Sequence, residues 1–352
     1  MLLLTGPPGS GKTSRVLDRV KDSARRGRDD VRLLVPTATM AEHLRNQVAR
    51  TGLLVRPRVI QTLWRFLESI VSDLPQAPEA TLRFLVRRAL ETNEARAFGE
   101  VRSFPGFQAA VANLLEELSE AGVHASSRGP LLDEEEFGGA LDAVFSRVEG
   151  EVRKRGLFLR AERLRVASER IAREGLPGVR AALFDGFFSF TSGELELIRA
   201  LSRRVETVVT LPDWAGAAPA RAALQAHGFA DERCERVRAH PAMLWFAAPN
   251  LVRETEEVAR RVIEMASAGR PFREIGVVVR GFSPCVPALR TTFERFGIPA
   301  RFYFAEALKD HPAVQRIARL VEARLGGWDH EETLGALRMG PASAELDRFE
   351  FG

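Results

Sequence analysis

The segment Gly6–Thr13 reads G-P-P-G-S-G-K-T, and the apolar residues Leu2–Leu4 stand directly before it. The spacing G-x-x-x-x-G-K-[ST] is that of a P-loop, a glycine-rich turn whose backbone N–H groups face the α- and β-phosphates of a nucleotide. After the loop, Val16, Val20 and Ala24 recur at helical spacing. The order strand, phosphate loop, helix predicts an α/β fold with a parallel sheet.

The loop also contains the two polar side chains that nucleotide binding requires. Lys12 is placed to reach the β- and γ-phosphates, and the Thr13 hydroxyl is placed to ligate Mg²⁺. Only four of the 51 basic residues are lysines, so a lysine at this position is informative. We therefore expect ATP and Mg²⁺ as cofactors, bound by Gly6, Pro7, Pro8, Gly9, Ser10, Gly11, Lys12 and Thr13.

Composition sets limits on the class of protein. A chain of 352 residues that is 45% hydrophobic and 28% charged is globular and long enough for two or three domains. It contains no apolar run of 18 residues, and the P-loop leaves no room for a signal peptide, so we expect no membrane span and a cytoplasmic location. Cys234 and Cys285 have no metal-type spacing. The net charge of +4 is too small to indicate nucleic-acid binding by itself.

The first part of the chain, residues 1–75, alternates between strand and helix patterns. Val31–Val35 is an apolar run stopped by Pro36, Thr39–Arg50 is helical, and Val59–Thr62 is a brief strand. Strand patterns return at Ala181–Phe184 and Thr207–Leu211. We therefore expect one P-loop domain made of residues 1–75 and 179–214.

Between these two parts, residues 76–178 form no strand pattern and predict a helical insertion. Its amphipathic stretches are Thr81–Leu90, Phe107–Ala121 and Leu141–Glu174. The four acids Asp133–Glu136 and the basic face of Glu151–Glu174 are typical of solvated surfaces.

The remainder of the chain predicts a second α/β unit. Residues 215–250 are expected to be a linker or surface excursion, and residues 251–352 the start of the second unit. Its expected elements are helix Arg253–Ala268, strand Ile275–Val279, helix Val286–Phe296, strand Arg301–Phe304, and helices Pro312–Leu325 and Glu331–Met339.

Asp185 directly follows the strand Ala181–Phe184. In P-loop proteins an acid at the end of a distant strand holds the Mg²⁺ that the loop threonine also contacts. ATPases that act on nucleic acids usually carry glutamate next, as the base that orients the attacking water, but here Gly186 follows. Glu194 and Glu196 are the nearest acids downstream.

These blocks together resemble the UvrD-like superfamily 1 helicases, and more closely the AddB-type subunit of the bacterial AddAB helicase–nuclease. The resemblance is carried by the P-loop, V-P-T-A-T-M-A-E-H-L-R (Val35–Arg45), V-I-Q-T-L-W-R-F-L (Val59–Leu67), L-F-D-G-F-F-S-F-T-S-G-E-L-E-L-I (Leu183–Ile198), R-E-I-G-V-V-V-R (Arg273–Arg280) and H-P-A-V (His311–Val314). It implies two RecA-like domains, single-stranded DNA as a partner, an AddA-type subunit as another, and a role in DNA repair and recombination.

The resemblance also implies roles for individual residues. Arg280 would match the arginine of the fourth helicase motif and approach the γ-phosphate. Thr37 and Thr62 would match positions along the single-strand path, and Trp64 would stack on a base or belong to the core.

The chain departs from the active helicases at several positions. It has Gly186 in place of glutamate, T-L-P-D-W at 210–214 in place of a G-D-x-x-Q motif, and no adenine-reading glutamine segment before Met1. No nuclease acid–acid–lysine cluster and no iron–sulfur cysteines match. We therefore expect a degenerate motor that scans DNA beside an active partner. An active superfamily 1 translocase and a P-loop small-molecule kinase remain as alternatives.

Overall fold

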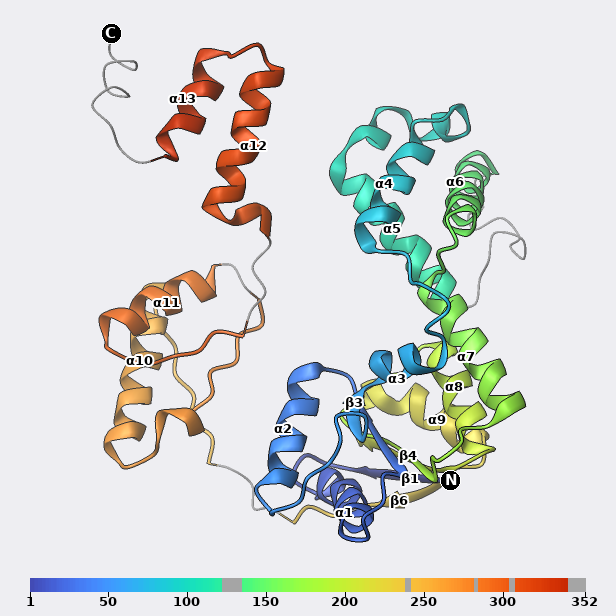
Figure 1. The fold of residues 1–352 in the computed structure, drawn as a ribbon. Coiled ribbons are helices and arrows are strands. Elements are labelled where there is room, and N and C mark those ends of the chain that lie inside the picture. The colour runs from blue at the N-terminus through green and yellow to red at the C-terminus, as the bar shows by residue number, and fades with distance from the viewer. Residues whose placement is uncertain (122–134, 238–241, 282–283, 304–307, 341–352) are drawn as a thin grey trace. The chain divides into compact units, whose positions relative to one another are not determined.

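The computed structural model describes residues 1–121, 135–237, 242–281, 284–303 and 308–340 (Figure 1). These residues fold into two units, Met1–Pro241 and Ala242–Gly352, and each has its own core. Asp133 and Glu134, half of the acidic run expected to be solvated, lie outside the described residues. Among the helices that the structure describes, none is both long and apolar enough to cross a membrane.

The first unit is built on a six-stranded parallel sheet with the order β3-β2-β4-β5-β1-β6. The α/β fold class is therefore confirmed. The strands are β1 (Leu2–Gly6), β2 (Val31–Val35), β3 (Ile60–Thr62), β4 (Ala181–Phe184), β5 (Glu206–Pro212) and β6 (Ala230–Arg233).

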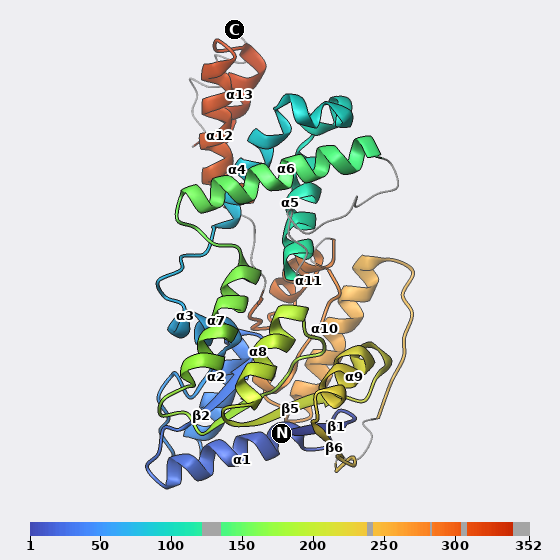
Figure 2. The ribbon, with the colours of Figure 1, turned by 90° about the vertical axis from the view of Figure 1, so that its right-hand side faces the viewer.

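Helices cover both faces of this sheet (Figure 2). One face packs against α1 (Lys12–Arg25) and α2 (Ala38–Ala49), and the other against α3 (Leu63–Ile70), α7 (Arg160–Glu174), α8 (Ser192–Ser202) and α9 (Ala218–Ala226). In β4, Ala181 and Leu183 face the first layer, whereas Ala182 and Phe184 face the second. Burial on both faces explains why the central strands are continuous apolar runs in the sequence.

The expected helical insertion has a separate core. It consists of α4 (Glu79–Leu90), the 3₁₀ segment η1 (Asn93–Ser103), α5 (Pro105–Glu120) and α6 (Glu135–Lys154). The stretch Leu141–Glu174 is divided into two helices by a turn at Gly156, and the second of them, α7, packs on the sheet. Two backbone hydrogen bonds join the chain segments that enter and leave the insertion. The Ala77 N–H donates to the Phe158 carbonyl (2.9 Å), and the Phe158 N–H donates to the Pro75 carbonyl (2.9 Å).

The sequence did not predict the last strand of the sheet. Residues 215–250, expected to be a linker or surface excursion, contain the short η3 (Ala215–Ala217), α9 and β6, and β6 pairs with β1. All four side chains of β6 are exposed, because this strand lies at the sheet edge. Asp231 of β6 accepts a hydrogen bond from the Thr5 hydroxyl (2.7 Å). An edge strand of polar residues has no apolar run by which to recognise it.

The second unit contains α10 (Leu251–Ser267), α11 (Cys285–Arg295), α12 (Pro312–Leu325) and α13 (His330–Arg338), with the short 3₁₀ turns η4 (Phe272–Glu274) and η5 (Leu308–Asp310). The strands expected at Ile275–Val279 and Arg301–Phe304 are wrong for the residues described, 275–279 and 301–303. These residues belong to no strand, and Val278 is 96% exposed. An apolar run forms a strand only where a neighbour satisfies its backbone groups.

Candidate functional site at the carboxyl edge of the sheet

The P-loop connects β1 to α1 and is shaped by close packing. A Cβ atom at Gly6 would lie 2.3 Å from the Cys234 carbonyl oxygen, and φ at Gly6 is +151°, so only glycine fits. Gly11 precedes α1 without a side-chain cap on the first turn. The unpaired N–H groups of such a turn, together with the helix dipole, favour a bound phosphate.

The ammonium group of Lys12 is held inside the loop. It donates to the Gly6 carbonyl (2.6 Å), the Pro7 carbonyl (3.0 Å) and the Ser10 hydroxyl (3.0 Å). Burial lowers the pKa of Lys12, and the nearby carboxylates of Asp213 and Asp185 oppose that shift. An anion bound in the loop would add a further opposing charge and so favour the ammonium form.

Asp185 follows the end of β4 and is only 1% exposed. The Thr210 hydroxyl donates to its Oδ1 atom at 2.6 Å, whereas Oδ2 is buried without a hydrogen-bond partner. Burial raises the pKa of Asp185. Hydrogen bonding by the Thr210 and Thr13 side chains and the positive charge of Lys12 oppose this rise. The structure therefore brings together Lys12, Thr13 and Asp185, the three polar residues that the sequence predicted for one site.

This donor set fits Mg²⁺. The ion prefers oxygen ligands and is usually held by one or two carboxylates together with phosphates and water. Asp185 Oδ2 is a carboxylate oxygen without a hydrogen-bond partner. The Thr13 hydroxyl is close enough to lower the pKa of the same carboxyl group. No group of three or more His, Cys, Asp or Glu side chains gathers among the described residues, so an all-protein metal cage is not formed there.

Gly186 has a structural reason to be glycine. Its φ is +83°, and a Cβ atom there would lie 2.5 Å from Met40 Sδ and 3.4 Å from Pro36 Cδ. The turn places Phe187 and Phe190 in the core and leaves Phe188 exposed. A glutamate in place of Gly186 would therefore strain the backbone and displace the tip of the Met40 side chain.

The two alternative acids lie on α8 and differ in burial. Glu194 is buried, and its carboxylate accepts from the Thr191 N–H (3.1 Å) in a capping box. Burial raises the pKa of Glu194. Glu196 is exposed on the same helix. The capping bond accounts for Glu194 without a catalytic role.

The predicted DNA residues Thr37 and Thr62 cap the helices that follow β2 and β3. The Thr37 hydroxyl accepts from the Met40 N–H (3.2 Å), and the Thr62 hydroxyl accepts from the Arg65 N–H (3.2 Å). Each hydroxyl hydrogen remains available, because these bonds use the oxygen as an acceptor. Both residues lie at the carboxyl edge, since Thr37 follows β2 and Thr62 ends the neighbouring strand β3.

Trp64 is partly buried against the core of the second helical layer. The Arg160 guanidinium carbon lies 3.5 Å from the centre of the Trp64 ring. One face of the indole is therefore covered by a cation.

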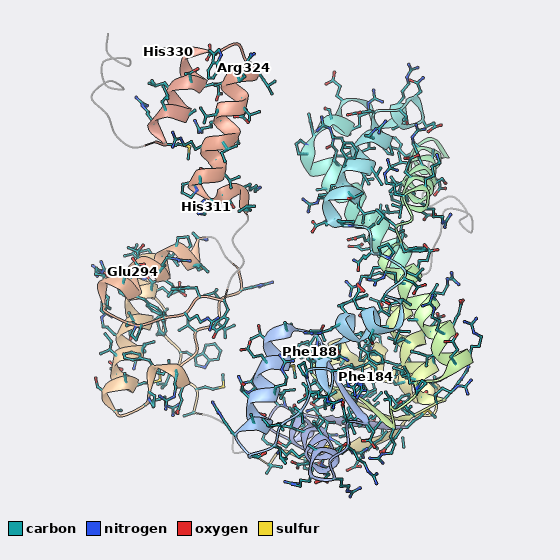
Figure 3. The ribbon with its side chains drawn as sticks, in the orientation of Figure 1. Phe184, Phe188, Glu294, His311, Arg324 and His330 are labelled. Carbon is teal, nitrogen blue, oxygen red and sulfur yellow. The ribbon has the colours of Figure 1, made fainter. Side chains whose placement is uncertain are left out.

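Phe188 and Trp214 form an exposed aromatic pair that the sequence did not single out. Their ring centres are 5.4 Å apart, and they are 58% and 54% exposed (Figure 3 labels Phe188). Phe188 follows β4 and Trp214 follows β5, so the pair lies at the same edge as the P-loop. Only the parallel pairing of β4 with β5 brings these two residues together.

The segment after β6 also supports the P-loop. The Cys234 N–H donates to the Thr5 carbonyl (2.7 Å), and the Val237 N–H donates to the Gly9 carbonyl (3.1 Å). Arg280, in contrast, lies in the second unit, exposed, directly after the extended residues 275–279.

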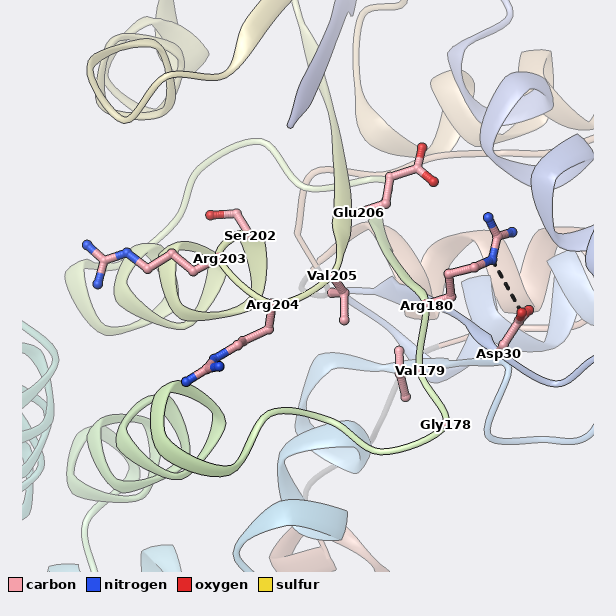
Figure 4. Close-up of a pocket in the computed structure, with 9 residues that line it drawn as sticks. All are labelled: Asp30, Gly178, Val179, Arg180, Ser202, Arg203, Arg204, Val205 and Glu206. Atoms are coloured by element: carbon pink, nitrogen blue, oxygen red, sulfur yellow. Dashed lines mark hydrogen bonds and ion pairs between the residues drawn. The ribbon is translucent and has the colours of Figure 1, made fainter.

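A hollow lies at the amino edge of the sheet, opposite the edge that carries the P-loop (Figure 4). Its lining includes Arg180, whose Nε lies 3.3 Å from Asp30 Oδ2, and Arg204, which donates to the Ala172 carbonyl. Since these arginines already have partners, the carboxyl edge is the stronger candidate.

Comparison with known proteins points to one class. The chain is similar to the B-type subunit of the ATP-dependent helicase/deoxyribonuclease of Natranaerobius thermophilus, with 28% identity over 99 residues, 27% of this chain and 8% of that protein. It is also similar to the protein of the same name from Listeria innocua serovar 6a, with 21% identity over 403 aligned positions, 96% of this chain and 34% of that protein. No protein-family profile matches.

These similarities are weak but agree with the resemblance carried by the motifs. The longer alignment covers nearly the whole chain, which spans about a third of the length of that relative. The comparisons thus show a similarity of this chain to the B-type subunit of helicase–deoxyribonucleases.

The Gly186 turn yields a stability prediction. Gly186→Ala should lower the free energy of unfolding by about 0.5–1.5 kcal/mol more than Gly27→Ala, because the tip of the Met40 side chain must move aside, whereas Gly27 has a similar φ of +67° but open space around its Cβ position. Met40→Ala should recover part of the excess. Urea unfolding of the four variants, including the double mutant, measures this, and equal losses at the two glycines would contradict the account of the turn.

Proposed function

We propose that this chain binds ATP with Mg²⁺ and single-stranded DNA at the carboxyl edge of its sheet, as part of a helicase–deoxyribonuclease subunit. The observation that carries the nucleotide proposal is the buried, unpartnered Oδ2 of Asp185 beside Thr13 and Lys12. Lys12 would neutralise the β- and γ-phosphates, and the first turn of α1 would donate its N–H groups to them. Thr13 and Asp185 would hold Mg²⁺, which supplies charge neutralisation when bound.

Removing the Lys12 ammonium tests the nucleotide site. Lys12→Ala should abolish ATP·Mg binding measured by isothermal titration calorimetry, because the phosphates lose their charge partner. Lys21→Ala is the matched control, since Lys21 lies on the same helix and pairs with Asp18 at 2.9 Å. Equal affinity of wild type and Lys12→Ala would refute the assignment.

We further propose that the bound ATP is hydrolysed slowly. Gly186 offers no side chain to orient the attacking water, and Glu194 is occupied in a helix cap. Loss of a general base typically costs 10²–10⁴-fold.

Turnover with saturating oligo-dT should therefore be about 0.1 s⁻¹ or below, against a median enzyme rate of about 10 s⁻¹. A coupled ATPase assay measures it. Several turnovers per second, abolished by Lys12→Ala, would show an active translocase.

For DNA we propose a path along the carboxyl edge. The strand order places Thr62, Thr37, Phe188 and Trp214 in a row, after β3, β2, β4 and β5, and the P-loop follows at β1. The two threonine hydroxyls can donate to phosphates. The exposed rings of Phe188 and Trp214 can stack on bases without sequence preference.

Truncating the aromatic pair tests the DNA path. The double variant of Phe188→Ala and Trp214→Ala should bind oligo-dT about 5- to 150-fold more weakly, the range expected for loss of one base stack. Trp245→Ala, which removes an 86% exposed indole from the second unit, should have no such effect. Fluorescence anisotropy at several salt concentrations measures this, and affinity should fall steeply with salt. Equal affinities of the two variants would contradict the path.

The names of the relatives also suggest a partner. Each is named as one lettered subunit of its enzyme, so we propose that this chain assembles with an AddA-type helicase–nuclease subunit. Arg280 of the second unit is proposed to approach the γ-phosphate of ATP.

A further inference from the structure

Arg160 connects Trp64 to the helical insertion. It is the first residue of α7 and covers the indole of Trp64, which belongs to α3. Its Nε lies 3.3 Å from Glu120 Oε1, at the end of α5 in the insertion. Its Nη2 lies 3.7 Å from Glu194 Oε1, on α8 of the sheet layer. One side chain thus contacts three elements.

The ion pairs of Arg160 with Glu120 and Glu194 lack strong hydrogen bonds. Its buried Nε has no hydrogen-bond partner, so the contact with Glu120 is an ion pair without good hydrogen-bond geometry. Glu194 is already used by the cap of α8. The guanidinium can therefore leave the indole without breaking a strong hydrogen bond.

Arg163, one turn further along α7, is anchored much more firmly. It is 2% exposed, pairs with Glu68 of α3, and donates to the Gln76 side chain at 3.1 Å. This anchor fixes α7 to α3. A shift of Glu120 together with the insertion would therefore act on Arg160, while Arg163 would keep α7 packed against α3.

The energies of the two competing contacts are similar. A cation on an aromatic face contributes about 2- to 30-fold to an equilibrium constant, and a base stacked on an aromatic ring about 5- to 150-fold. Since these two ranges overlap, a nucleic-acid base can replace the Arg160 guanidinium on the Trp64 ring. A modest change in the contact between Arg160 and Glu120 can then decide whether the guanidinium or the base covers the ring.

We propose that Arg160 closes the base-stacking face of Trp64 and that displacement of the helical insertion opens it. The insertion then controls how tightly the carboxyl edge holds single-stranded DNA. This inference rests on the proposed DNA path. Trp64 becomes a further stacking position, available only in the open state, in addition to the exposed Phe188 and Trp214.

The test compares Arg160→Gln with the control variant Arg165→Gln. The control removes the same charge from the same helix, at a residue that forms only an exposed ion pair with Glu169. Oligo-dT affinity is measured by anisotropy, and solvent access of Trp64 by fluorine NMR of 5-fluorotryptophan protein, with Trp64→Phe to assign its signal. Arg160→Gln should bind about 2- to 30-fold more tightly than Arg165→Gln. The Trp64 signal should become more sensitive to solvent, and adding Trp64→Ala should remove the gain.

Glu120→Gln tests the link to the insertion and serves if Arg160→Gln does not fold. It should tighten oligo-dT binding relative to Glu117→Gln, an exposed acid on the same helix. Equal affinities of these two variants would overturn the link.

Two results would overturn the closure itself. Weaker binding by Arg160→Gln than by Arg165→Gln would mean that Arg160 holds DNA phosphate. An unchanged solvent response of Trp64 in Arg160→Gln would mean that the ring is not covered. The fluorine measurement needs no DNA, so it separates failure of the closure from failure of the proposed DNA binding.

Discussion

Parallel pairing of β1, β4 and β5 is the constraint on which the candidate site depends. Because all strands run in the same direction, every strand ends at one edge, and residues 170 or more positions apart meet there. Thr13 and Lys12 come from the turn after β1, and Asp185 comes from the end of β4. The Thr210 hydroxyl of β5 fixes one oxygen of Asp185 and leaves the other unpartnered. Disruption of this pairing would separate the phosphate loop from the carboxylate.

The same geometry explains what could be predicted from sequence. Gly6–Thr13 and the buried strands have strong local patterns, because strands packed on both faces must be apolar throughout. The position of Asp185 follows from its strand. The α/β class and the meeting of Lys12, Thr13 and Asp185 were therefore accessible from the sequence.

Other features depend on contacts that no local pattern encodes. β6 was missed because its side chains are all exposed, and residues 275–279 were assigned to a strand because their apolar character hides the lack of a backbone partner. The pair of Phe188 and Trp214 is created by the neighbouring positions of β4 and β5. The left-handed turn at Gly186 explains a glycine that, from sequence, is only a missing glutamate.

The central claim is that Asp185 and the P-loop form one site for ATP and Mg²⁺, and the metal dependence of nucleotide binding tests it most directly. ATP affinity is measured by calorimetry, with Mg²⁺ and with EDTA, for wild type and for Asp185→Asn. The account predicts that Mg²⁺ strengthens ATP binding in wild type and that this gain is largely lost in Asp185→Asn, while metal-free binding is kept. An equal gain from Mg²⁺ in both proteins would contradict it.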